Sequence, residues 1–195
     1  MLSAMVNAQE IQKDLNAFDK IILSPKINLI LQKGDKESIR IKYSNVSSDK
    51  INIEVSNNRL RIYLDDARLV EKQKKTHDEN YSFKASIYRD AVITAYVTYR
   101  ELKVLDVRGE EEVTCDGAIN NENFKLKAYG EVEITLASLH TKKFKAVLYG
   151  ENKLKIKEGQ AGHQRYRLYG ENKIDTQALS SETVSTTIYG RVDLV

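Results

Sequence analysis

Three kinds of side chain that could carry chemistry return at a constant interval in the last part of the chain. Stacked repeats would turn each kind into a row. Neighbouring carboxylates about 5 Å apart would resemble the pair of a retaining glycosidase or a calcium site, and a row of phenol rings could hold sugars or a partner protein. The acidic column is Glu131, Glu151 and Glu171, the tyrosine column is Tyr129, Tyr149, Tyr169 and Tyr189, and the basic column is Lys125, Lys145 and Arg165.

Each column also has a purely structural explanation, because any repeat generates such rows. Stacked aromatic side chains stabilise adjacent strands by about 0.2–1 kcal/mol per pair. Alternating acidic and basic rows would form a mixed, solvated surface. A catalytic site should break the repeat with special residues at one turn, and these acidic residues are periodic. We therefore predict no catalytic residues, and we take the three columns as a candidate binding surface.

No cofactor or metal site is expected. The single cysteine, Cys115, excludes an internal disulfide and a cysteine-based zinc site, and it is predicted to be a small buried hydrophobe. His77, His140 and His163 have no metal-ligand spacing. The 31 basic and 28 acidic residues are interleaved, so the net charge of +3 does not indicate nucleic acid. No apolar run is long enough to span a bilayer.

A glycine-marked repeat positions these columns. Gly130, Gly150, Gly170 and Gly190 recur at one constant interval, and Gly109 precedes the first of them by an interval that is one position longer. Counted from each glycine, even positions are mostly apolar and odd positions mostly polar, which is the alternation of a strand. This repeat predicts a parallel β-helix of about 20 residues per turn, with even positions filling the interior and odd positions facing out. The glycine marks a corner where a side chain would obstruct the bend.

The rest of the chain indicates strands as well. Residues 18–64 alternate in short segments that are broken by turn-forming residues, whereas residues 66–80 are highly charged and predict a surface loop. We expect an all-β protein with an N-terminal β portion at residues 17–100 and β-helix repeats at residues 101–195, sharing one continuous core. Asn152 and Asn172 fall at an inward position just past the corner, where their amides would satisfy backbone groups.

Both ends of the sequence support specific expectations. Val6-Asn7-Ala8 resembles the end of a secretory cleavage site, so residues 1–16 are expected to be a signal-peptide remnant or flexible. The last repeat stops at Val195 in mid-turn, and an open solenoid end exposes core and unpaired strand edge. We expect this end to be covered by a partner chain, by a second copy or by further residues.

An ordered series of motifs resembles a known family. The segments are FDKIILSPKINLILQKGDKESIRIKY from Phe18 to Tyr43, with its Gln-Lys-Gly turn, VSNNRLRIYL from Val55 to Leu64, and VTYRELKVLDVRGEEEV from Val97 to Val113. Over most of residues 17–195 the chain resembles the putative auto-transporter adhesin, head GIN domain family. It departs from the family in having Tyr-Gly-Glu corners in place of Ser-Gly-Ser or Ser-Gly-Ala. The resemblance implies a β-helical protein that is secreted, periplasmic or on the outer-membrane surface of a Gram-negative bacterium, with no established catalysis.

Three functional hypotheses remain open from the sequence. The first is a non-catalytic, adhesin-like module that binds a glycan or a protein partner through the flank of the solenoid. The second is a polysaccharide-degrading β-helix enzyme, either a lyase or a hydrolase. The third is a structural or assembly protein that stacks end to end, as a homo-oligomer formed through the open carboxy-terminal end.

Overall fold

The computed structural model of the protein describes residues 9–78 and 81–195. Strands make up most of this part of the chain, and its one helical element is a single 3-10 turn, η1 (Ser48–Lys50). The predicted all-β class is therefore confirmed. No helix among the residues described is long and apolar enough to cross a membrane.

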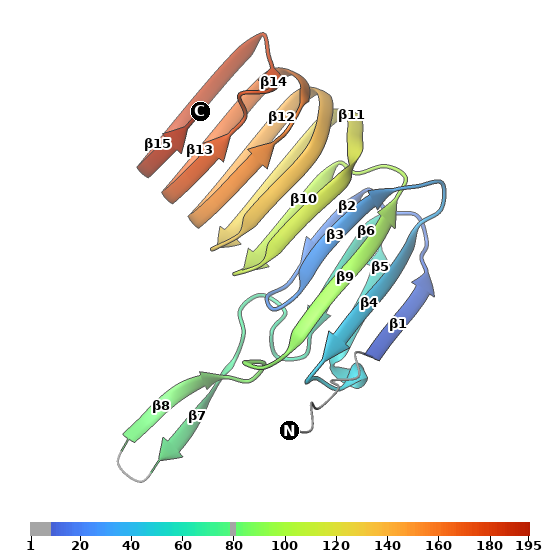
Figure 1. Cartoon of the computed structure of the whole chain (residues 1–195), viewed down its shortest axis with the longest axis vertical. Coiled ribbons are helices and arrows are strands. Elements are labelled where there is room, and N and C mark those ends of the chain that lie inside the picture. The colour runs from blue at the N-terminus through green and yellow to red at the C-terminus, as the bar shows by residue number, and fades with distance from the viewer. Residues whose placement is uncertain (1–8, 79–80) are drawn as a thin grey trace, which may run out of the picture.

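Long parallel strands stack into a solenoid at one end of the molecule (Figure 1). Residues one repeat apart lie opposite each other in adjacent turns, so that Tyr129 pairs with Tyr149 and Gly130 with Gly150. The predicted parallel β-helix is confirmed. Its strands are β11 (Glu112–Gly130), β12 (Glu133–Ile156), β13 (Gly159–Asp175), β14 (Leu179–Ser180) and β15 (Thr183–Leu194).

Each turn of the solenoid contributes to three faces. The first face, which we call the flank sheet, stacks residues 104–109, 125–130, 145–150, 165–170 and 185–190. The second begins with residues 113–115 and 134–136, and the third stacks residues 118–121, 138–141 and 159–161. A register shift between Cys115 and Ala118 inserts an extra position into the first turn. This bulge explains why the interval from Gly109 to Gly130 is longer by one position than the intervals that follow.

The N-terminal strands extend two of these faces. Beyond β10 (Val104–Gly109), the flank sheet continues with β2 (Lys20–Leu23), β6 (Arg59–Leu64) and β5 (Ile51–Ser56). Beyond residues 113–115, the second face continues with β3 (Asn28–Lys33), β9 (Val92–Tyr99), β4 (Ser38–Ser44) and β1 (Gln9–Asp14). One hydrophobic cluster runs between the faces from Phe18 to Leu179. The division into domains near residue 100 stays a prediction.

Two segments differ from the expectations. Residues 9–14, predicted to be flexible, form β1, which pairs antiparallel with β4 and packs Ile11 against the core; residues 1–8 lie outside the described part. The loop predicted at residues 66–80 is a loop only up to residue 72. It is followed by a hairpin of β7 (Gln73–Asp78) and β8 (Tyr81–Ser86), which projects from the body (Figure 1).

The inward columns of the solenoid are buried as the alternation predicted, up to the last turn. Val113, Ile134, Leu154 and Ile174 form one such column. In β15 the equivalent apolar positions have no further turn beside them in the described structure, and Val184, Ile188 and Leu194 are 54%, 45% and 41% exposed. This strand therefore presents an apolar edge.

A short amide ladder lies inside the corner, as predicted for Asn152 and Asn172. Asn152 is buried, and its Nδ2 donates to Asn172 Oδ1 at 3.0 Å and to the carbonyl of Tyr149 at 3.1 Å. Its Oδ1 accepts from the backbone N–H of Val132 at 3.3 Å. The ladder thus satisfies backbone groups that the corner removes from the strand pairing.

The glycine column sets how closely the turns approach. Gly130, Gly150 and Gly170 have φ values of 118°, 105° and 94°, a region that residues with a Cβ rarely adopt. A Cβ built on Gly150 would also collide with the backbone carbonyl of Gly130, one turn below. Because the obstacle is backbone, it cannot rotate away.

We predict that Gly150→Ala lowers the free energy of unfolding by more than about 3 kcal/mol, because a strained φ and a backbone clash act together. Denaturant unfolding followed by circular dichroism measures this loss. Gly162→Ala is the matched control, since Gly162 does not adopt a positive φ and its Cβ would meet its nearest neighbour only at 3.0 Å. Equal losses in the two variants would contradict the role given to the column.

Candidate functional site

The tyrosine column forms a continuous stack on the outside of the flank sheet. Ring centroids of successive tyrosines are 5.2, 4.4 and 5.1 Å apart, with interplanar angles of 3°, 4° and 8°. Strand alternation turns these side chains outward, and the zero register shift places each ring over the one before it. We call Tyr129, Tyr149, Tyr169 and Tyr189 the tyrosine ladder.

A charged cluster closes one end of the ladder. The guanidinium of Arg108 lies 4.5 Å from the ring centroid of Tyr129. The carboxylate of Asp106, which is only 6% exposed, lies 3.5 Å from Arg108 Nε and 3.3 Å from Lys127 Nζ. This arrangement holds Arg108 against the ring face, where a cation is favourable.

Stacking leaves ring edges and hydroxyl groups as the accessible parts of the ladder. Both faces of Tyr149 and Tyr169 are covered by neighbouring rings, and Arg108 covers one face of Tyr129. The rings of the row stack face to face, so that their edges point outward. None of the four hydroxyls has a hydrogen-bond partner among the residues that the structure describes. The ladder therefore offers a line of phenol groups that can donate and accept hydrogen bonds.

The basic column lies on the same sheet, four positions before the tyrosines. Lys125 pairs with Lys145 and Lys145 with Arg165, so their side chains are in line across three turns. They border a groove of about 550 Å³ that Val104 also lines and that lies over the buried Phe124 and Phe144. We call this the basic groove. It gains further cations that sequence analysis missed: Lys20, Lys103 and Lys143.

Most of the cations in the basic groove have no acidic neighbour. Within the described residues, Lys125, Lys143, Lys145 and Arg165 have no carboxylate within 4.0 Å, whereas Lys103 Nζ lies 3.1 Å from Asp19. Burial lowers the pKa of Lys145, and the positive charges of Arg167 and Lys125 lower it further. The groove is thus a region of concentrated positive potential.

The acidic column lies across the corner from the other two. Glu131, Glu151 and Glu171 follow the glycines, and they line a separate hollow of about 420 Å³ together with Lys153 and Arg191. The described part of the chain holds no group of three or more His, Cys, Asp or Glu side chains that could bind a metal ion. The tyrosine and basic columns therefore lie on the flank sheet, and the glutamates, just past the corner, line a different hollow from the basic column.

Elsewhere on the solenoid, cations are paired with carboxylates one turn away. Lys155 Nζ lies 2.7 Å from Asp175, and Lys153 and Lys142 pair in the same way with Glu133 and Glu122. Opposite charges on neighbouring turns are favourable. The basic groove lacks this alternation of charge.

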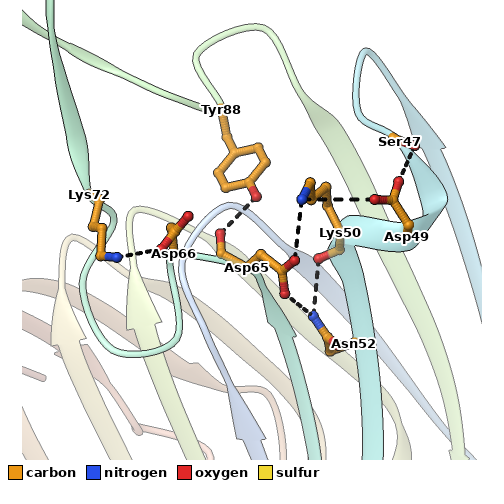
Figure 2. A network of polar contacts seen from close by, with 8 residues as sticks. All are labelled: Ser47, Asp49, Lys50, Asn52, Asp65, Asp66, Lys72 and Tyr88. Carbon is orange, nitrogen blue, oxygen red and sulfur yellow. Dashed lines mark hydrogen bonds and ion pairs between the residues drawn. The ribbon is translucent and has the colours of Figure 1, made fainter.

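A second polar cluster lies at the edge of the flank sheet and is structural. In Figure 2, the carboxylate of Asp65 accepts hydrogen bonds from Asn52 at 2.8 Å and Lys50 at 3.5 Å, and its carbonyl accepts one from the Tyr88 hydroxyl at 2.7 Å. Lys72 pairs with Asp66 at 2.5 Å. Because each charge has a partner, the cluster fastens the base of the β7–β8 hairpin to the body and leaves no free group for a ligand.

The remaining chemical candidates are accounted for by packing. Cys115 is buried as predicted, with its Sγ 3.3 Å from the Tyr99 hydroxyl, and burial raises the pKa of the thiol. His140 and His163 are exposed and lie within β12 and β13. The Nδ1 of His163 lies 2.7 Å from the Thr183 hydroxyl. His77 lies in the hairpin, outside the side chains described.

Comparison with known families and structures agrees with this architecture. The family described as "Putative auto-transporter adhesin, head GIN domain" matches residues 17–194. None of the curated proteins matches the sequence.

Solved structures of low sequence identity share the fold. A putative adhesin from Parabacteroides merdae ATCC 43184 is 13% identical, with a TM-score of 0.65 over 96% of this chain and 80% of its own. A putative adhesin from Parabacteroides distasonis ATCC 8503 is also 13% identical, with a TM-score of 0.67 over 95% and 80%. A putative lipid binding protein from Parabacteroides distasonis ATCC 8503 is 12% identical, with a TM-score of 0.61 over 95% and 81%.

We predict that Tyr149→Ala lowers the free energy of unfolding by about 1–3 kcal/mol, because it removes two stacked contacts. Tyr149→Phe keeps both contacts and should change stability by less than about 0.5 kcal/mol. Thermal or denaturant unfolding of the two variants makes the comparison. If the phenylalanine variant loses as much as the alanine variant, the hydroxyl and not the stacking stabilises the turns.

Proposed function

Because the chain belongs to the putative auto-transporter adhesin, head GIN domain family, we propose that it is a non-catalytic, adhesin-like module that binds an extended glycan through the flank sheet. The proposed location is the cell envelope of a Gram-negative bacterium or its surroundings: secreted, periplasmic or on the outer-membrane surface. The family match supports this location.

The observation that carries the proposal is the alignment of two rows of polar side chains on one sheet. Neither row has hydrogen-bond or ion-pair partners among the described residues. The hydroxyls of the tyrosine ladder lie in one row, and the cations Lys125, Lys145 and Arg165 lie in another, four positions earlier in each turn. Both rows cross the strands. A ligand that lies along them meets the same groups once per turn, about every 4.8 Å. An extended polymer of hydroxyl-bearing units has this kind of periodicity.

Several features favour binding over catalysis. Glu131, Glu151 and Glu171 recur unchanged from turn to turn, and none of them lines the basic groove. Glycoside hydrolysis commonly uses two carboxylates with different protonation states. The repeated column gives its members no such difference in residue type or position.

The test is a glycan array with purified protein, comparing the wild type with Tyr149→Phe/Tyr169→Phe. We expect the wild type to bind an extended glycan and the double variant to bind it at least about tenfold more weakly, because two hydrogen bonds to hydroxyls are lost. Tyr96→Phe is the control, since Tyr96 lies on the second face. Equal binding by all three proteins, binding to no glycan, or release of new reducing ends would contradict the proposal.

The apolar edge of β15 supports a further partner for the module. We propose that it pairs with another chain, and a second copy would give a homo-oligomer. Light scattering should show association that rises with concentration and is abolished by Ile188→Lys, because a charge on an edge strand opposes edge-to-edge pairing. A wild type that stays monomeric at high concentration would contradict a homo-oligomer.

A further inference from the structure

The geometry points to an acidic polysaccharide as the ligand of the basic groove, with its anionic groups on Lys125, Lys145 and Arg165 of successive turns. This inference rests on the proposed function and narrows its ligand class. The shared chemistry is a carboxylate, sulfate or phosphate group on each of several sugar units.

The first support is the stacking of like charges. Lys125, Lys145 and Arg165 are directly opposite one another on adjacent strands. Like charges in such positions are destabilising. At other positions the chain places opposite charges on neighbouring turns, as in the Lys155–Asp175 pair, whereas Glu151 and Glu171 are again like charges in register. The row in the basic groove costs stability in the free protein, and an anionic ligand would neutralise it.

The second support is the shape of the groove. The groove lies over Phe124 and Phe144, which are buried in the core, and four of its cations lack acidic partners among the residues described. The apolar core beneath the groove lowers the local dielectric, which strengthens the attraction between the cations and a bound anion. Lys20 of β2 is in register with Val104 and, through it, with Lys125. Lys20 thus places a further cation of the groove on the N-terminal strands, with Asp19 4.0 Å from its Nζ.

The geometry of the tyrosine ladder favours a polysaccharide over a nucleic acid as the ligand. Single-stranded nucleic acids bind through bases stacked on aromatic faces. In the ladder, the faces of Tyr149 and Tyr169 are covered by the neighbouring rings. Hydroxyl groups remain accessible, and they suit the hydroxyl groups of sugars. The surface therefore combines charge recognition with hydrogen bonding and offers little room for base stacking.

The experiment compares two triple variants that each remove three positive charges. The groove variant is Lys125→Gln/Lys145→Gln/Arg165→Gln. The matched control is Lys142→Gln/Lys153→Gln/Lys155→Gln, whose lysines are paired with carboxylates on other faces. Titration calorimetry with polygalacturonate, dextran sulfate and neutral dextran measures binding. The two acidic polymers distinguish carboxylate from sulfate as the preferred group.

We expect the wild type to bind at least one acidic polymer and not dextran, with an affinity that falls as salt rises. The groove variant should bind at least about tenfold more weakly and the control variant within about twofold of the wild type. Removing like charges should leave the thermal midpoint of the groove variant unchanged or raised. A lower midpoint would overturn the argument that the row is uncompensated.

Other outcomes separate this inference from the proposed function. Equal binding of dextran and the acidic polymers, lost in Tyr149→Phe/Tyr169→Phe but kept in the groove variant, would overturn the acidic ligand and leave glycan binding intact. Binding of no polysaccharide would overturn both. Tighter binding of single-stranded DNA or of phosphatidylglycerol vesicles than of either acidic polymer, with loss in the groove variant, would overturn the polysaccharide in favour of those ligands.

Discussion

The stacking of one turn directly on the next is the constraint on which the rest of the structure depends, and the glycine column permits it. At each corner the carbonyl of one glycine occupies the space that a side chain on the next would need, as for Gly130 and Gly150. The positive φ of these glycines turns the chain sharply at the same point of every turn. Residues one repeat apart are therefore held opposite each other along the whole turn.

Because equivalent residues of successive turns lie opposite each other, each repeated position forms a row of side chains along the solenoid. Each row needs interactions that offset the cost of placing similar groups side by side. The buried Asn152 and Asn172 do so by hydrogen bonding to each other. The tyrosine ladder does so by stacking, and Lys155 and Asp175 do so by placing opposite charges on neighbouring turns. The acidic column and the basic groove are different, because like charges such as Glu151 and Glu171, or Lys125 and Lys145, lie opposite each other. A basic row that costs stability in the free protein becomes favourable when an anion occupies it.

The sequence predicted the repeats well because a solenoid is governed by local rules that recur. The alternation of apolar and polar residues predicted the inward column of Val113, Ile134 and Leu154. The spacing of the glycines predicted which residues of adjacent turns pair with each other. It could not give the orientation of the tyrosine rings, which depends on side-chain torsions that only stacked neighbours fix. It also missed Lys20 and Lys103 in the groove, since strand pairing over a long sequence separation brings them there. Strand β7 of the hairpin was missed because the composition of residues 66–80 is that of an exposed loop.

The most direct test of the account is a crystal structure of the protein with an acidic oligosaccharide. The account predicts that the sugar chain crosses the strands along the basic groove, with successive anionic groups near Lys125, Lys145 and Arg165 and sugar hydroxyls turned toward the tyrosine ladder. A chain bound along a single strand, on the second or third face, or among Glu131, Glu151 and Glu171 would contradict it.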